Sequence, residues 1–209
     1  MGMVLSLGSV SDATIQRLLA DPPLVWQIIA PDDPDVYARA RREGADRNRP
    51  GFFARLFGAP ATTGPTPAAP PPPLALSDGE GLIADLDKAW HGIHFLFTGS
   101  ADDGRPPLNF LVAGGTEVGE EDVGYGSARA FTAAETREIA TALATVSDDE
   151  LRGRFAPKAM MAADIYPGIW DRDPDDDDTL GYLIEYVGTL RETLATVTGH
   201  GHGLMVFLS

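Results

Sequence analysis

The sequence of 209 residues contains no cysteine. This absence excludes disulfides, thiolate metal sites and a cysteine nucleophile, and it fits a reducing compartment. Long hydrophobic runs are also missing, since no apolar stretch approaches the roughly 20 residues that a membrane-spanning helix needs. No basic stretch leads into an apolar one near the start, where the first cation is Arg17. We therefore expect a cytoplasmic protein with no membrane partner.

Positive charge is scarce as well. The chain has 16 lysine and arginine residues against 31 aspartate and glutamate residues, which gives a net charge of -15. A field of this sign repels phosphate backbones, so we expect no nucleic-acid partner. The same field would steer a basic protein towards this one.

The hydrophobic content of 44% is enough for one sizeable core, so we expect a single domain over residues 1–209. Small, apolar and β-branched residues fill Met3–Val10, and Leu204–Leu208 (LMVFL) is apolar throughout, which predicts a strand near each end. Two short strands are not stable alone, and we expect them to join a sheet, with each other or with further strands. The prediction is an α+β fold in which a small sheet, including the N- and C-terminal strands, is covered by several helices.

Helix start signals recur between the two terminal strands. They are the N-cap Ser11 and two capping boxes, Thr132 with Glu135 and Ser147 with Glu150. The clearest apolar period of 3.6 residues predicts a helix over Leu86–Thr98 that ends at Gly99. The other expected helices cover Asp12–Ala20, the segment from Pro34 to just before Gly44, the stretches after each capping box, Lys158–Asp164 and Thr179–Val197.

Between Ala45 and Gly81 the composition changes to proline, glycine, alanine and threonine. Such a stretch buries little apolar area, so we expect a loop or a polyproline spacer inserted into the domain. Within it, Gly51–Gly58 (GFFARLFG) has apolar residues at helical spacing. We expect this segment to dock onto the core, and a partner-binding helix is the alternative.

Several segments have an order and spacing typical of one family. They are the opening MGM with its strand, Leu86–Gly99 (LDKAWHGIHFLFTG), the pair Gly114 and Gly115, Tyr125–Glu135 (YGSARAFTAAE), Asp149–Phe155 (DELRGRF) and Ile165–Trp170 (IYPGIW). On these residues the chain resembles the YfbM-like family of uncharacterised bacterial proteins, over nearly its whole length apart from the proline-rich insertion. Family members often have Tyr-Gly-Pro-Ala-Arg where this chain has Ser127 in place of proline. The resemblance implies an α+β fold and a soluble domain, and it implies no catalytic residues.

The first candidate site lies on the predicted helix Leu86–Thr98. At about 100° per residue, a stripe beside the apolar face is formed by Asp87, His91, His94 and Thr98. Two imidazoles and a carboxylate can hold a metal ion, or the carboxylate can orient a histidine base. The alternative is that both histidines are half-buried and hydrogen-bonded to their neighbours. We favour this alternative and assign no metal, because one helix alone cannot complete a metal site.

The second candidate site consists of Tyr125, Arg129, Tyr166 and Trp170. Arg129 lies in a segment poor in cations, and an arginine with aromatic neighbours can clamp a carboxylate, a phosphate or a ring. The favoured alternative is a structural arginine that pairs with an acid and ties a loop to the core. The predicted ligand-binding residues are therefore Asp87, His91, His94, Tyr125, Arg129 and Trp170.

Three suggestive stretches have simpler explanations. The glycine-rich stretch Ala113–Gly126 lacks the spacing of a phosphate-binding loop and carries acids that would repel a phosphate. Asp171–Asp178 fails the calcium-loop pattern at two positions and is expected to be a solvated turn whose last residue caps the next helix. His200 and His202 lie on a glycine-rich turn with few ligands nearby.

Two functions from different classes stay open. The charge of -15, without a convincing active site, favours a binding module that neutralises a basic partner protein. The alternative is a small-molecule-binding protein or a metal-dependent enzyme built on the histidine stripe and Arg129. No substrate, cofactor or oligomeric state follows from the sequence.

Overall fold

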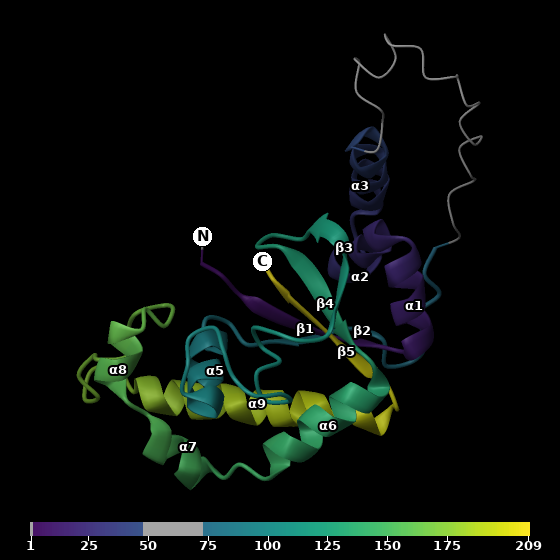
Figure 1. Cartoon of the computed structure of the whole chain (residues 1–209). Helices are drawn as coiled ribbons and strands as arrows, with labels where there is room; N and C mark the ends of the chain where they lie inside the picture. Colours follow the sequence, from purple (N-terminus) through teal and green to yellow (C-terminus); the bar gives the residue numbers. More distant parts are fainter. Residues whose placement is uncertain (1, 48–72) are drawn as a thin grey trace, which may run out of the picture.

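A computed structural model describes residues 2–47 and 73–209 (Figure 1). Its strands are β1 (Leu5–Val10), β2 (Gly81–Asp85), β3 (Thr116–Asp122), β4 (Ser127–Phe131) and β5 (Gly203–Leu208). Its helices are α1 (Asp12–Ala20), the 3-10 helix η1 (Pro22–Val25), α2 (Trp26–Ile29), α3 (Pro34–Arg47), α5 (Trp90–Thr98), α6 (Ala133–Ala144), α7 (Asp148–Arg154), α8 (Pro157–Ala162) and α9 (Thr179–Gly199). In these two ranges no helix is long and apolar enough to cross a membrane.

The five strands form one antiparallel sheet in the order β2-β1-β5-β4-β3. Strand β1 pairs directly with β5, from Leu5 opposite Leu208 to Val10 opposite Gly203. The first and last strands therefore lie side by side, and the two chain ends lie close together (Figure 1). The prediction of an α+β fold with both terminal strands in one sheet is confirmed.

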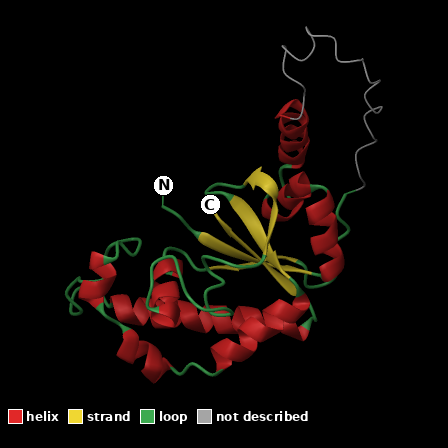
Figure 2. Cartoon of the chain, viewed as in Figure 1, coloured by secondary structure: helices red, strands yellow, loops and turns green. Residues whose placement is uncertain are grey.

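Alternate residues of the central strand β5 point to opposite faces of the sheet. Leu204 and Val206 enter a core that the helices α5 to α9 cover. Met205 and Phe207 enter a smaller core against α1, η1 and α2. Helices therefore cover both faces of the sheet (Figure 2), which explains why this strand is an unbroken apolar run rather than an alternating one.

Local capping signals set the helix ends as expected. The Ser11 side chain accepts a hydrogen bond from the Thr14 N–H, and both predicted capping boxes are present. Asp178, the last residue of the acidic stretch, accepts from the Gly181 N–H at 2.7 Å at the start of α9. Gly99 takes a left-handed φ of 75° and ends α5.

Helix α5 begins at Trp90, so the prediction that it starts at Leu86 is wrong. The Leu86 N–H donates to Leu5 O, and the Leu5 N–H donates to Asp87 O, which prolongs the pairing of β2 with β1. Asp87 then turns the chain with a left-handed φ of 42°. A contact with β1, distant in the sequence, thus overrides the helical period that Leu86 belongs to.

The proline-rich stretch lies mostly outside the described residues, and so does Gly51–Gly58. At its start, residues 45–47 belong to α3 and not to a loop. At its end, residues 73–80 are irregular and held against the first helices. Pro73 O accepts from the Arg17 guanidinium at 3.2 Å, and the Leu74 N–H donates to the Gln27 side chain at 2.7 Å.

Candidate ligand-binding cleft

Arg129 lies in the middle of β4, between β3 and β5. Its register partners are Glu117 on β3 and Val206 on β5. Because side chains alternate along a strand, Arg129 lies on the same face as Phe131 and Val206, which belong to the core under α5 to α9. The strand pattern therefore places a guanidinium at the border of the larger core.

The segment that connects α5 to β3 fixes the Arg129 guanidinium. It donates to Leu111 O at 2.8 Å and to Gly114 O at 3.0 Å, and its Cζ lies 5.7 Å from the centroid of the Phe131 ring. A guanidinium has five N–H donors, so five minus these two leaves three. Burial lowers the pKa of Arg129 to about 10, against the opposing effect of the Glu117 carboxylate. The side chain stays cationic at neutral pH.

Arg129 forms no ion pair with the described part of the chain, where no carboxylate oxygen lies within 4.0 Å of its guanidinium. Arg191 provides the contrast, because it pairs with Asp148 at 2.6 Å. Arg129 does tie a loop to the sheet, as the structural alternative expects, but it does so through carbonyls and not through an acid.

A cleft of about 450 Å³ opens beside Arg129. This volume lies in the range of small-molecule sites. Its walls come from the start of α5, from the segment between α5 and β3, and from β1, β3, β4 and β5. The side chains that bear on its chemistry are Trp90, His91, Asp102, Glu117, Tyr125 and Arg129. Tyr125 is 51% exposed and lies at the rim.

His91 presents its ring to the cleft but no free nitrogen. Its Nδ1 accepts a hydrogen bond from the Tyr166 N–H at 2.9 Å, so the ring proton is on Nε2, which lies 2.8 Å from Ala101 O. Burial lowers the pKa of His91, and the ring stacks on Trp90 at 4.8 Å between centroids. His91 is therefore a neutral wall residue with both nitrogens in use, which leaves neither for a metal ion or a substrate proton.

His94 is completely buried and does not line the cleft. Its Nε2 lies 3.0 Å from Asp103 O, while its Nδ1 has no hydrogen-bond partner. Burial lowers the pKa of His94 to about 4. The imidazole is therefore neutral at pH 7 and joins α5 to the loop that follows it.

Asp87 and Trp170 also lie away from the cleft. Asp87 accepts a hydrogen bond from the Tyr182 hydroxyl on α9 at 3.0 Å. Trp170 is 1% exposed, and its indole N–H donates to Ile165 O at 2.7 Å. Of the six residues predicted to bind a ligand, three therefore share the cleft and three make contacts within the fold.

Two acidic residues of the cleft are missing from the predicted set. Glu117 lies across from Arg129, and Asp102 belongs to the segment after α5. The sequence does contain a signal for Glu117. A glycine-rich turn separates its segment from that of Arg129, and a hairpin at this turn would bring the two residues opposite each other. Asp102 has no such signal, since its place depends on the path of a long connection.

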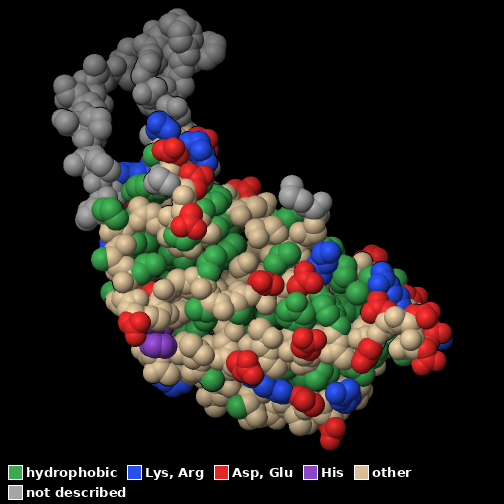
Figure 3. Space-filling model, turned by 180° about the vertical axis from the view of Figure 1, so that it is seen from behind, with side chains coloured by type: hydrophobic (Ala, Val, Ile, Leu, Met, Phe, Trp, Pro, Cys, Tyr) green, Lys and Arg blue, Asp and Glu red, His purple; other side chains and the backbone are tan. Residues whose placement is uncertain are grey.

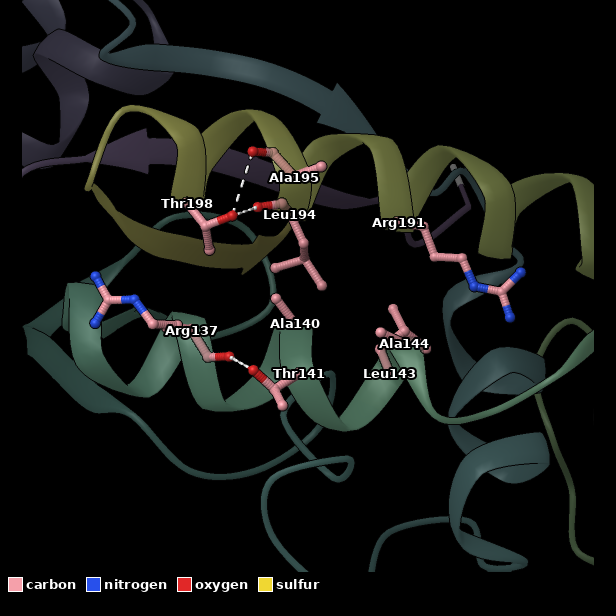
Figure 4. Close-up of a pocket in the computed structure, with 9 residues that line it drawn as sticks. All are labelled: Arg137, Ala140, Thr141, Leu143, Ala144, Arg191, Leu194, Ala195 and Thr198. Carbon is pink, nitrogen blue, oxygen red and sulfur yellow. Dashed lines mark hydrogen bonds between the residues drawn. The ribbon is translucent and has the colours of Figure 1, made fainter.

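A second cavity of about 410 Å³ lies between α6 and α9 (Figure 4). Alanine and leucine side chains line its middle, while Arg137 and Arg191 lie at opposite ends (Figure 4). The Thr141 hydroxyl donates to Arg137 O and the Thr198 hydroxyl to Leu194 O, both at 2.7 Å. Its hydroxyls thus serve their own helices, and the cavity lacks the converging polar groups of the cleft at Arg129.

Residues 2–47 and 73–209 contain no group of three or more histidine, cysteine, aspartate or glutamate side chains that could hold a metal ion. His200 and His202 stack at 5.5 Å between ring centroids. The Nδ1 of His202 lies 3.0 Å from the Ser9 hydroxyl, but Ser9 is completely buried. This serine and histidine pair is therefore closed to a substrate.

The fold and the cleft define an α+β protein with helices on both faces of an antiparallel sheet and an arginine at the border of its larger core. Residues 1–207 match the family described as "Domain of unknown function (DUF1877)", so the chain belongs to this family. Among solved structures it is similar to YfbM from Escherichia coli, a protein of unknown function, with 17% identity, 100% of each chain covered and a TM-score of 0.60. No curated protein matches the chain. The resemblance to YfbM-like proteins is confirmed, and at this identity it shows the fold alone.

Proposed function

We propose that this protein binds a small ligand in the cleft and holds the ligand's carboxylate on Arg129. The observation that carries the proposal is a guanidinium fixed by two carbonyls, with three N–H donors left and no carboxylate within 4.0 Å among the residues described. A half-buried charge without a counter-ion is costly. A ligand carboxylate would offset that cost through charge-assisted hydrogen bonds, which are the strong ones.

The aromatic rings of the cleft support the same proposal. The stacked pair of Trp90 and His91 gives one wall a flat surface, and the Tyr125 ring stands at the rim. We propose binding and assign His91 no role as a general base, because a general base needs a free lone pair within reach of the substrate proton. The imidazole in the cleft has none, since both of its nitrogens are engaged.

Replacing Arg129 with glutamine is expected to weaken carboxylate binding by about tenfold or more, since a hydrogen bond to a charged group contributes roughly 1.5 to 3 kcal/mol. The measurement is isothermal titration calorimetry of small carboxylates and their matched amides against the wild type and the variant. The variant also loses about 1 to 3 kcal/mol of stability, because two carbonyls lose their donor.

The matched control is Arg152→Gln, which removes the same charge from an exposed position on α7. It should leave both affinity and stability unchanged. Equal carboxylate affinity of the wild type and the Arg129 variant, or no carboxylate binding by the wild type, would contradict the proposal.

We also propose a basic protein as a second partner class, on the strength of the net charge of -15. Acidic side chains are spread over the face seen in Figure 3 rather than gathered in one place, which suits long-range steering more than a single ion pair. The test is affinity capture from native lysate at low and at high salt. The expected result is a basic protein that salt releases, and recovery of acidic or salt-insensitive proteins alone would refute this second proposal.

A further inference from the structure

We infer that the ligand of this cleft is a zwitterion of the amino-acid type, with its carboxylate on Arg129 and its ammonium on Glu117. The inference rests on the proposed function and adds a second recognition group to it. It follows from the register of β3 and β4, from the charges in the cleft and from the field of the whole protein.

Glu117 and Arg129 are directly opposite in the antiparallel pair of β3 and β4. Such a pair has Cβ atoms about 4.5 to 5.5 Å apart, yet the two charged groups do not join, since no oxygen to nitrogen contact within 4.0 Å exists between them. Arg129 is drawn to the carbonyls of Leu111 and Gly114. Glu117 is exposed and has no hydrogen-bond or ion-pair partner in the described ranges.

An unjoined pair of opposite charges matches a ligand that carries both charges. In an α-amino acid the carboxylate and the ammonium are attached to one carbon atom, so the two groups lie side by side as Arg129 and Glu117 do. The ligand carboxylate would bind Arg129 and the ligand ammonium would bind Glu117. Neither contact requires the backbone of β3 or β4 to move. Both contacts would be charge-assisted hydrogen bonds.

The other charges in the cleft favour a ligand with no net charge. Arg129 is its one cation among the lining residues, and Glu117 and Asp102 are its acids. A phosphate or dicarboxylate would meet both acids and a protein of net charge -15, which repel it. A simple cation would leave Arg129 without a partner. A zwitterion satisfies the cation and one acid and meets no net repulsion.

The remaining walls fit an apolar side chain on the ligand. They include Leu5, Trp90, Leu111, Val112 and Val206. The volume of about 450 Å³ leaves room for a large side chain beside the two charged groups. We therefore expect aromatic and branched aliphatic amino acids to bind better than glycine.

The experiment is isothermal titration calorimetry of the full chain with L-phenylalanine, L-leucine, N-acetyl-L-phenylalanine and L-phenylalaninamide. The acetyl form lacks the ammonium, and the amide form lacks the carboxylate. Each is expected to bind about tenfold more weakly than free phenylalanine, as the loss of one charge-assisted hydrogen bond predicts. Glu117→Gln should abolish the preference for the free over the acetylated form and keep carboxylate binding. Glu138→Gln, the same change at an exposed position on α6, should alter nothing.

The outcomes separate the inference from the proposed function. If N-acetyl-L-phenylalanine binds wild type as tightly as phenylalanine and Arg129→Gln still weakens binding by about tenfold or more, the zwitterion is overturned while the carboxylate site stands. If none of the four compounds binds, this inference is overturned, and the wider carboxylate panel then decides the proposed function. Because Glu117 is exposed, its glutamine variant is expected to keep the wild-type unfolding temperature, and that measurement accompanies the titrations.

Discussion

Replacing Trp170 with alanine is expected to lower the free energy of unfolding by about 3 to 5 kcal/mol. The indole is 1% exposed and packs on α5 at Gly92, where an added Cβ would come within 2.7 Å of the ring. The truncation leaves a cavity that the surrounding helices cannot fill. Ile165 O also loses the indole N–H at 2.7 Å and keeps only the Gly168 N–H at 3.0 Å. The whole free energy of unfolding of a small domain is roughly 5 to 15 kcal/mol, so the loss is large. Urea denaturation with linear extrapolation measures it.

Two variants show which part of Trp170 matters. Trp170→Phe keeps a ring in the core and removes the indole N–H, while Ile165 O keeps the Gly168 N–H. A loss of roughly 0.5 to 1.5 kcal/mol is therefore expected for this hydrogen bond. Tyr125→Ala removes the ring of a residue that is 51% exposed, and its effect should stay within about 0.5 kcal/mol. A different result would contradict the structural role of Trp170. If Trp170→Ala lowered the free energy of unfolding by less than about 1 kcal/mol and also weakened ligand binding, Trp170 would be a ligand-binding residue.

The elements that the sequence predicts are those set by neighbouring residues. Ser11, Thr132 and Ser147 cap helices through hydrogen bonds to residues three positions ahead, and such signals are visible in a short window. The sequence also offers the pairing of β1 with β5 as one of two expectations, because two short apolar strands are not stable alone and must join a sheet.

The elements without a sequence signal are those that depend on distant contacts. Strand β3 has the sequence TEVGEED, and its charges and glycine do not resemble a strand. It is one of the two edge strands of the sheet, where the exposed Glu117, Glu120 and Asp122 discourage pairing with other chains. The local pattern places Asp87 in a helix, because the hydrogen bond that its carbonyl accepts from Leu5 on a distant strand leaves no trace in neighbouring residues.

The residues of the candidate site also differ in whether local or distant contacts place them. Arg129 and Tyr125 are near each other in the sequence, and the hairpin keeps both at the cleft. Trp170 joins them in a sequence-based set only because aromatic rings suit both binding sites and cores. Its burial depends on where α5 and α9 pack, and Gly92 provides the space for the ring. Composition alone cannot distinguish these two uses of tryptophan.

The stability of the protein is expected to fall between pH 7.5 and pH 5.0, with His94 contributing about 2 kcal/mol of the loss. Burial lowers the pKa of His94 from its usual 6.5 to about 4. His94 is therefore protonated near pH 6.5 in the unfolded chain, but only near pH 4 in the native protein. In that window the unfolded state binds more protons, so acid favours unfolding. The loss begins as the pH falls through 6.5 and is complete below about 4.

The surroundings of His94 explain why its pKa is low in the native protein. Asp103 O already takes the Nε2–H, so a second proton would have to sit on Nδ1, which is buried and has no acceptor. His94→Gln keeps a donor for Asp103 O and cannot titrate. Its urea-derived stability should therefore lose about 2 kcal/mol less than wild type between pH 7.5 and 5.0, while both measurements stay above the isoelectric point near 4.4. His200→Gln shows what loss of an exposed imidazole does to the same pH profile. Identical profiles for the wild type and the His94 variant would mean that His94 is protonated in the native protein well above pH 4.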